Sequence, residues 1–166
     1  MGESYAALYA ARMASEALQD RFAAPSICFG CGPANAQGLQ VKSIPQGDAV
    51  ICTWVPKPEH QAFPGVLNGG IVGAVLDCHC NWTAAWHLMQ RDGLDAPPCT
   101  VTADYSVTLK RPTPTNAPLH LTARALSSDG AKVVVEGTLE GGGKVCALFR
   151  GTFVAVKPDH PAFHRW

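Results

Sequence analysis

The segment from Leu67 to Asp77 constrains this chain more than any other. It reads LNGGIVGAVLD, a glycine pair followed by small and apolar residues and then a single carboxylate. Asp77 is the only acidic residue between Glu59 and Asp92. A lone charge in such apolar surroundings is costly to bury unless it is hydrogen-bonded or paired. Asp77 is therefore the first candidate for a functional residue.

The same segment predicts the start of a long helix. Asn68 is a favourable N-cap residue, because its side-chain oxygen can accept an N–H of the first helical turn. Small and apolar residues follow at helical spacing, and we expect one helix over residues 69–90. A helix that is apolar on nearly every side must be covered by a sheet or by a partner. One face carries Ile71, Val75, Cys78, Trp82 and Trp86, and a face of small residues carries Gly70, Gly73, Ala74, Asp77, Asn81 and Ala84.

The rest of the chain predicts antiparallel sheet. Residues 100–110 alternate between apolar and polar side chains, as expected of a strand with one face on a core. No βαβ repeat is present, so the expected fold class is α+β, with five to six antiparallel strands wrapped around one long helix. The expected strands cover residues 38–44 and 48–55 with a turn at 45–48, then 100–110, 119–125, a strand led by Val133 and Val135, and 145–156 after a turn at 141–143.

The two ends of the chain are expected to lie outside this domain. Amphipathic spacing predicts an N-terminal helix over residues 4–22, ending before Ala24-Pro25. We expect three parts: a helical extension (1–24), a single domain (25–157) and a C-terminal tail (158–166) without periodicity.

Composition argues against several classes of protein. The formal net charge is zero and no basic run exceeds Lys110-Arg111, which argues against a nucleic-acid platform. No apolar run reaches the roughly 20 residues of a membrane span, and the N-terminus lacks the apolar stretch of an export signal. Seven cysteines, an odd number, fit a reduced cytoplasm better than a disulfide framework. With only 16% charged residues, part of the surface is expected to be covered by other subunits.

A second motif, CFGCGP, places Cys28 and Cys31 two residues apart. Such a pair can supply half of a tetrahedral zinc site. The nearest candidates for the other half are Cys78, His79 and Cys80, but residues i and i+2 of a helix do not share a face. We therefore expect a tight glycine-rich turn with two reduced, buried cysteines, and neither a metal nor another cofactor.

Four motifs together make residues 28–156 resemble the hotdog-fold acyl-CoA thioesterases, particularly the phenylacetate-pathway type. The resemblance implies hydrolysis of an acyl-CoA thioester by a homodimer or a dimer of dimers. The motifs are Gly65-Val66-Leu67-Asn68-Gly69-Gly70, the aspartate nine residues after Asn68, the strand end Lys110-Arg111-Pro112, and Cys28-Phe29-Gly30-Cys31-Gly32-Pro33.

The resemblance also implies roles for individual residues. The Gly69 N–H would polarise the thioester carbonyl, and Asp77 would activate water or attack directly. Thr102, from the opposing subunit, would help to position the water or the carboxylate. The family pattern reads His-Gly-Gly, and here Asn68 stands in place of the histidine. Many members also have an asparagine at the position of Ala62.

Helix geometry supports a site shared between two chains. The N-terminus of a helix presents unpaired N–H groups and a positive dipole end, which suit a developing oxyanion. Asp77 lies about 12 Å further along the same helix axis than Gly69. One chain therefore separates the donor and the carboxylate too widely, and we expect the site to form at a dimer interface. Candidate substrate contacts are Gly70, Thr102, Gln61, Phe63 and Arg111, the last of these near the phosphates of coenzyme A.

Other readings of these residues remain open. Asp77 could be a structural carboxylate, Asn68 only a helix cap, and Thr102 only a half-buried strand residue. A non-catalytic acyl-CoA binding protein is the second hypothesis, since Asn68 cannot exchange a proton as histidine does. A hotdog dehydratase ranks last, because it needs a catalytic histidine beside a carboxylate and His79 points away from Asp77 on a helix.

Overall fold

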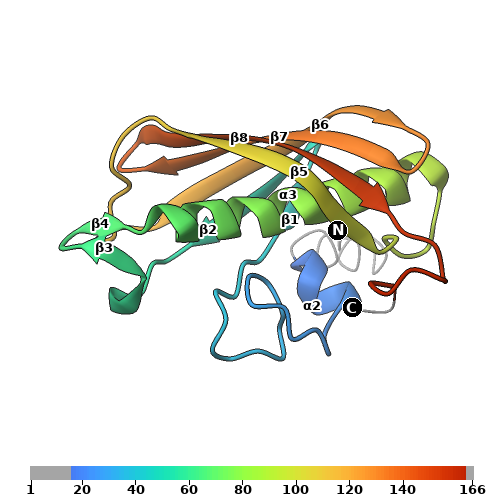
Figure 1. The fold of residues 1–166 in the computed structure, drawn as a ribbon, viewed down its shortest axis with the longest axis horizontal. Helices are drawn as coiled ribbons and strands as arrows, with labels where there is room; N and C mark the ends of the chain where they lie inside the picture. The colour runs from blue at the N-terminus through green and yellow to red at the C-terminus, as the bar shows by residue number, and fades with distance from the viewer. Residues whose placement is uncertain (1–15, 164–166) are drawn as a thin grey trace, which may run out of the picture.

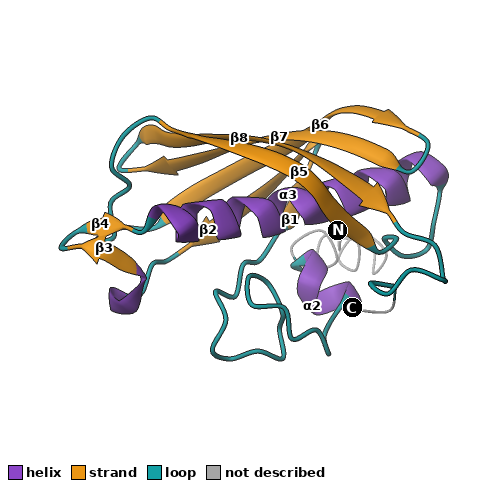
Figure 2. Ribbon diagram, in the orientation of Figure 1, coloured by secondary structure: helices purple, strands orange, loops and turns teal. Residues whose placement is uncertain are grey.

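The computed structural model describes residues 16–163. A six-stranded antiparallel sheet curves around one long helix, which confirms the predicted α+β hotdog arrangement (Figures 1 and 2). The strand order is β1-β2-β6-β7-β8-β5. The strands are β1 (Ile44–Gln46), β2 (Ala49–Trp54), β5 (Thr100–Leu109), β6 (Leu119–Asp129), β7 (Lys132–Gly141) and β8 (Lys144–Ala155). The helices are α2 (Leu18–Phe22), the 3-10 turn η1 (Pro58–His60) and α3 (Gly69–Asp92), and a small hairpin pairs β3 (Gln61–Phe63) with β4 (Val66–Leu67).

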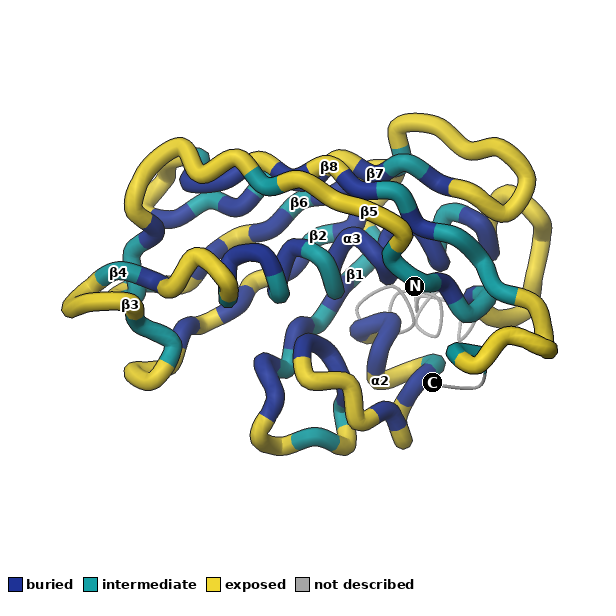
Figure 3. The backbone as a smooth tube through the Cα atoms, viewed as in Figure 1, coloured by how far each residue is buried: buried dark blue, intermediate teal, exposed yellow. Residues whose placement is uncertain are grey.

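The core lies between α3 and the concave face of the sheet. Buried residues alternate with half-buried or exposed ones along β7, the pattern of a strand that covers a core on one side (Figure 3). Segment 16–43 runs across the side of α3 that faces away from the sheet (Figure 1). The helix is thus covered on both sides, which explains why it is apolar nearly all round. The largest fully buried side chains include Trp82, Phe153, Leu76, Leu88, Leu121 and Leu139.

The two ends of α3 follow from local sequence. The Asn68 side-chain oxygen accepts hydrogen bonds from Gly70 N at 2.8 Å and Ile71 N at 3.4 Å, which confirms the predicted N-cap. The helix continues two residues past the predicted end and stops at Gly93, which adopts the left-handed conformation with φ of 63°. Glycine at this position closes the helix without a Cβ clash.

The predicted strand over residues 38–44 is wrong for most of its length. Only β1, which begins at Ile44, joins the sheet. Upstream of it, Leu39 N and Val41 N donate to the backbone oxygens of Phe29 and Gly30. The backbone of this segment is therefore paired with the cysteine-containing loop, and Gln40, with a φ of 56°, interrupts the extended conformation. The two strands meet at a turn around Gly47, close to the predicted one.

Strand β5 departs from the predicted simple alternation. A register shift between Thr102 and Asp104, a β-bulge, leaves one extra residue in this strand. Thr102 pairs with Phe153 and Tyr105 pairs with Gly151, so both lie on the face toward α3. Without the bulge, three residues of separation would put them on opposite faces. The bulge is what brings the threonine hydroxyl to the helix.

At the N-terminus, α2 ends before Ala24-Pro25, as predicted. Most of the expected helix over residues 4–22 lies outside the described residues. The last three residues of the expected tail also lie outside them.

A buried polar chain joins α2, the segment before β1, and α3. Gln19 Nε2 donates to Ser43 Oγ at 3.0 Å, and Ser43 Oγ lies 2.9 Å from His79 Nδ1. The other ring nitrogen, Nε2, lies 3.1 Å from the Val50 backbone oxygen. The carbonyl can only accept, so Nε2 carries the proton and Nδ1 accepts from the serine. His79 is therefore a neutral structural residue, in agreement with its low rank as a catalytic base.

Acid should destabilise the fold through His79. Burial lowers the pKa of His79 to about 4 from an ordinary 6.5. Below pH 6.5 the His79 side chain binds a proton in the unfolded chain but not in the folded chain. The free energy of unfolding therefore decreases as the pH is lowered from 6.5 to the folded-state pKa of about 4. The expected slope is about 1.4 kcal/mol per pH unit, or about 3 kcal/mol in all. Urea unfolding at several pH values measures it.

Carboxylates titrate in the same range, so His79→Gln provides the comparison. This variant should show a flatter fall of unfolding free energy between neutral and acid pH. If the unfolding free energy fell equally steeply with pH in wild type and in His79→Gln, the buried neutral state proposed for His79 would be wrong.

Candidate functional site

A cavity of about 310 Å³ lies between α3 and the loop that precedes residue 32. Asp77, half-buried on α3, contributes its side chain to the wall. Ligand sites are typically concave and apolar with a few converging polar groups, and this lining fits that description. The residues that line the cavity are Ser26, Ile27, Cys28, Cys31, Asp77, Cys78, Asn81, Trp82 and Thr102.

A directional chain of hydrogen bonds ends on Asp77. Thr100 Oγ1 donates to Asn81 Oδ1 at 2.6 Å, and Asn81 Nδ2 donates to Thr102 Oγ1 at 3.3 Å. Thr102 Oγ1 then donates to Asp77 Oδ1 at 2.8 Å. Each group in this series donates to the next, so the series fixes the position of the Asp77 carboxyl group.

Two residues of this hydrogen-bond series, Asn81 and Thr102, differ from what the sequence predicted. Asn81 lies four residues after Asp77 on the predicted face of small residues, but the sequence pattern predicted no functional role for it. Thr102 was predicted, but as a residue of the opposing subunit. That expectation is wrong for this contact, since Thr102 and Asp77 bond within one chain.

The N-terminus of α3 lies apart from this cavity. Gly69, Gly70 and Asn68 are all exposed and none lines the cavity wall. The Asn68 oxygen is occupied by the Gly70 and Ile71 N–H groups. Within residues 16–163, no acceptor is paired with the Gly69 N–H. About 12 Å of helix axis still separates Gly69 from Asp77.

The remaining predicted contacts surround the β3–β4 hairpin and the end of β5. Gln61 Oε1 accepts from Gly65 N at 2.6 Å and Gln61 Nε2 donates to Pro58 O, so this side chain stabilises the turn. Phe63 and Arg111 are exposed to solvent. Ala62 is exposed as well. These residues lie at the same end of the molecule as the helix N-terminus and do not line the Asp77 cavity.

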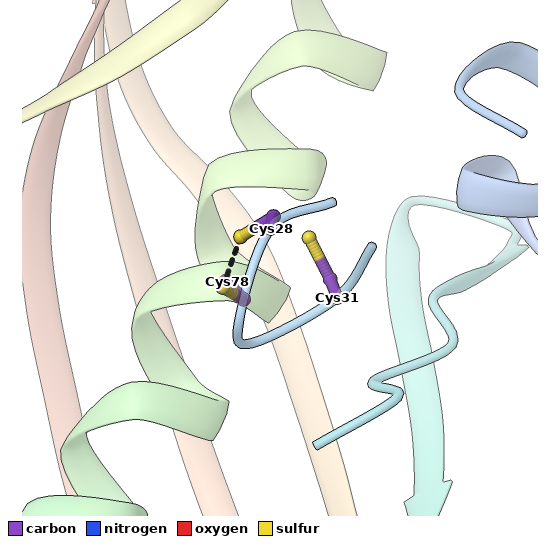
Figure 4. Close-up of side chains that lie close together, drawn as sticks. All are labelled: Cys28, Cys31 and Cys78. Atoms are coloured by element: carbon purple, nitrogen blue, oxygen red, sulfur yellow. Dashed lines mark hydrogen bonds between the residues drawn. The ribbon is translucent and has the colours of Figure 1, made fainter. Parts of the chain in front are cut away.

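The two cysteines of the loop meet a third from α3 (Figure 4). Cys31 is buried as expected, whereas Cys28 is exposed, so the expectation of two buried cysteines is wrong for Cys28. Hydrogen bonds from the thiols of Cys31 and Cys78 lower the pKa of Cys28. Donating to Cys28 raises the pKa of Cys31 to about 12 and that of Cys78 well above its ordinary value.

Comparison with solved structures identifies the family. A thioesterase superfamily protein from Shewanella loihica PV-4 is 30% identical, with a TM-score of 0.60 over 75% of this chain and 98% of that one. The chain belongs to the thioesterase superfamily. A second thioesterase superfamily protein is 31% identical, with a TM-score of 0.65 over 78% of this chain and 60% of that one.

More distant structures support the fold of this thioesterase superfamily member. The Escherichia coli PaaI protein, from the phenylacetic acid degradation operon, has a TM-score of 0.61 at 16% identity, over 75% of this chain and 85% of that one. No protein-family model and no curated protein matches the chain. Among the described helices of this superfamily member, none is long and apolar enough to cross a membrane.

Proposed function

We propose that this protein hydrolyses an acyl-CoA thioester to the free acid and coenzyme A. Asp77 activates a water molecule, and the Gly69 N–H of a second copy of the chain binds the developing oxyanion. The observation that carries the proposal is the oriented carboxylate. Asp77 lines a cavity and accepts a hydrogen bond from Thr102 at 2.8 Å. A carboxylate held in this way is suited to general-base catalysis.

The proposed reaction has two steps. Asp77 takes a proton from water while the water oxygen attacks the thioester carbonyl carbon, and the carbonyl oxygen becomes an oxyanion bound by Gly69 N–H. The tetrahedral intermediate then collapses, the C–S bond breaks, and coenzyme A leaves as a thiolate that takes the proton back from Asp77, which regenerates the carboxylate. A preorganised backbone donor costs no reorganisation when the charge develops. Direct attack by Asp77 through an anhydride would use the same two groups.

The edge of the sheet supports assembly of the site from two chains. Strand β5 lies at one edge of the sheet, and Tyr105 and Leu109 on it are 49% and 56% exposed in the single chain. Long edge strands with apolar side chains are usually covered. Antiparallel pairing of two β5 edges, centred between Tyr105 and Ser106, would bring Leu109 of one copy opposite Thr102 of the other.

That pairing would also join the two halves of the site. Leu109 lies beside the helix N-terminus, because a Cβ on Gly69 would be 3.4 Å from Leu109 Cδ1. Thr102 lies beside Asp77. A two-fold axis near Tyr105 therefore relates the Gly69 end of one helix to the Asp77 end of the other, as isologous dimers require.

A panel of short, long and aryl acyl-CoA thioesters tests the activity. Release of free coenzyme A, followed with a thiol reagent, should reveal turnover of at least one class. The second candidate, a non-catalytic acyl-CoA binding protein, is favoured by Asn68, whose side-chain oxygen caps its own helix. Tight binding measured by calorimetry, without release of thiol from any thioester, would support that candidate and contradict hydrolysis.

Removal of the Thr102 hydroxyl should slow hydrolysis without stopping it. Thr102→Val keeps the shape of the side chain but loses the hydrogen bond to Asp77. A hydrogen bond to a charged group contributes about 1.5–3 kcal/mol, so kcat/KM should fall roughly tenfold to a hundredfold. Thr102→Ser restores the donor and should recover most of the rate. Equal rates for the valine and serine variants would show that the hydroxyl has no positioning role.

A further inference from the structure

The three sulfur atoms of the cysteine cluster have the spacing of ligands around one ion. Their Sγ atoms all lie within 4.8 Å of one another, and Cys28 Sγ is 3.9 Å from Cys78 Sγ (Figure 4). Tetrahedral zinc with Zn–S bonds of about 2.3 Å separates two sulfurs by about 3.8 Å. A disulfide would need about 2.05 Å. The observed separation matches a thiol–thiol hydrogen bond in the metal-free chain and equally two ligands on one metal.

The loop is built for this close approach. A Cβ on Gly30 would lie 2.1 Å from Cys78 Sγ, so glycine is what admits the helix sulfur to the turn. A Cβ on Gly32 would lie 2.3 Å from Cys28 N. The turn is closed by a hydrogen bond of 2.8 Å from Gly32 N to Cys28 O. A side chain at either position would collide with the backbone of the turn or with the Cys78 sulfur, so glycine is required at both.

Neighbouring donors also orient the sulfurs. Trp82 Nε1 donates to Cys31 Sγ at 3.3 Å, and the indole N–H can only donate. Cys28 N donates to Ser26 Oγ at 3.4 Å, which holds the start of the turn. Hydrogen bonds from outer residues to metal ligands fix the ligands and stabilise their charge.

We propose that Cys28, Cys31 and Cys78 bind a zinc ion through three thiolates, with the fourth coordination position open to the cavity that Asp77 lines. Thiolate ligands favour Zn²⁺ among the common divalent ions, and each thiol that still holds a proton releases it to solvent on binding. Among residues 16–163, none that lines this cavity is cationic. A divalent ion complements the negative charge of the three thiolates.

Only one of the three candidate ligands on α3 reaches the loop. Cys78, His79 and Cys80 cannot act together, since His79 bonds to Ser43 and Val50 and Cys80 packs against Gly137 on other faces. Cys78 alone reaches the loop. Three protein ligands with an open fourth position are typical of exchangeable or catalytic zinc sites, whereas closed structural sites have four.

Metal content tests the proposal directly. The full chain, purified under reducing conditions, should contain about one zinc per chain by mass spectrometry. After removal of zinc with a chelator, Co²⁺ should bind with the intense thiolate-to-cobalt absorption. Cys28→Ser, Cys31→Ser and Cys78→Ser should each lose the metal. Cys99→Ser, a half-buried cysteine outside the cluster, should keep it.

Gly30→Ala tests the geometry while keeping all three sulfurs. The added methyl group would displace Cys78 Sγ, so metal binding should weaken at least tenfold even where circular dichroism reports a folded chain. If the reduced, folded wild-type chain takes up neither Zn²⁺ nor Co²⁺, or if Cys78→Ser binds as much as wild type, the proposal is wrong. The wild-type titration decides the matter even if a variant fails to fold. It uses no substrate, so its outcome is separate from that of the hydrolase proposal.

Discussion

Replacement of Asp77 by asparagine is expected to abolish most thioester hydrolysis while leaving the fold intact. Asparagine keeps the size of the side chain and an oxygen that can accept the Thr102 hydroxyl. Its amide, however, can neither take a proton from water nor attack a carbonyl. General-base catalysis typically contributes a factor of 10² to 10⁴, so kcat/KM should fall by about that much. Release of coenzyme A measures it.

The stability of this variant should not fall in parallel. Asparagine keeps the shape of the cavity wall and an acceptor for the Thr102 hydroxyl. Unfolding by urea should therefore give a free energy close to that of wild type. Asp104→Asn is the matched control, because Asp104 is an exposed carboxylate on β5 that accepts from Thr152 Oγ1. Full activity in Asp77→Asn would contradict the mechanism, as would an equal loss in Asp104→Asn.

Local sequence patterns predicted α3 and its N-cap. The position of Thr102 beside Asp77 depends instead on the pairing of β5 with β8, which local patterns do not predict. Asn68 and the apolar spacing after it act within a few residues, so the helix start was predictable. The bulge after Thr102 depends on pairing with β8, more than 40 residues away along the chain. No local alternation could reveal it. The contact between Thr102 and Asp77 therefore came from the resemblance and was assigned to the wrong chain.

The cysteine cluster was likewise predictable only in part, because it joins two segments that are far apart in the sequence. Cys28 and Cys31 were visible as a pair from their spacing, and helical geometry correctly argued that Cys78 and Cys80 do not share a face. Sequence spacing could not predict that the loop packs across α3 and so brings Cys78 to the pair. The backbone N–H groups of Leu39 and Val41 pair with that loop and not with a neighbouring strand, which also explains why the predicted first strand was too long.

Gly69→Pro is expected to remove the oxyanion donor without disturbing the helix. Gly69 is the first helical residue, a position where proline is favoured because its N–H has no partner within the helix. Asn68 has φ of −62° and ψ of 132°, the extended conformation that precedes proline readily. Loss of one such donor typically lowers kcat by about 10² to 10³. Thiol release and thermal unfolding, measured together, would separate lost chemistry from lost folding.

Gly69→Ala is the control that keeps the N–H. Its Cβ would lie 3.4 Å from Leu109 Cδ1, an ordinary contact, and alanine favours the helix. The alanine variant should therefore retain much more activity than the proline variant. Equal losses in the two would point to crowding at the helix end and against a role for the backbone donor.

Mixing two inactive variants should restore activity if the site spans two chains. In a heterodimer of Asp77→Asn with Gly69→Pro, one of the two sites combines an intact Gly69 with an intact Asp77, and the other site carries both changes. Random exchange of subunits should therefore recover about a quarter of wild-type activity. A site contained within one chain would recover none, because every chain in the mixture lacks one of the two groups. Recovery that fails to appear, although native mass spectrometry detects heterodimers, would contradict the shared site.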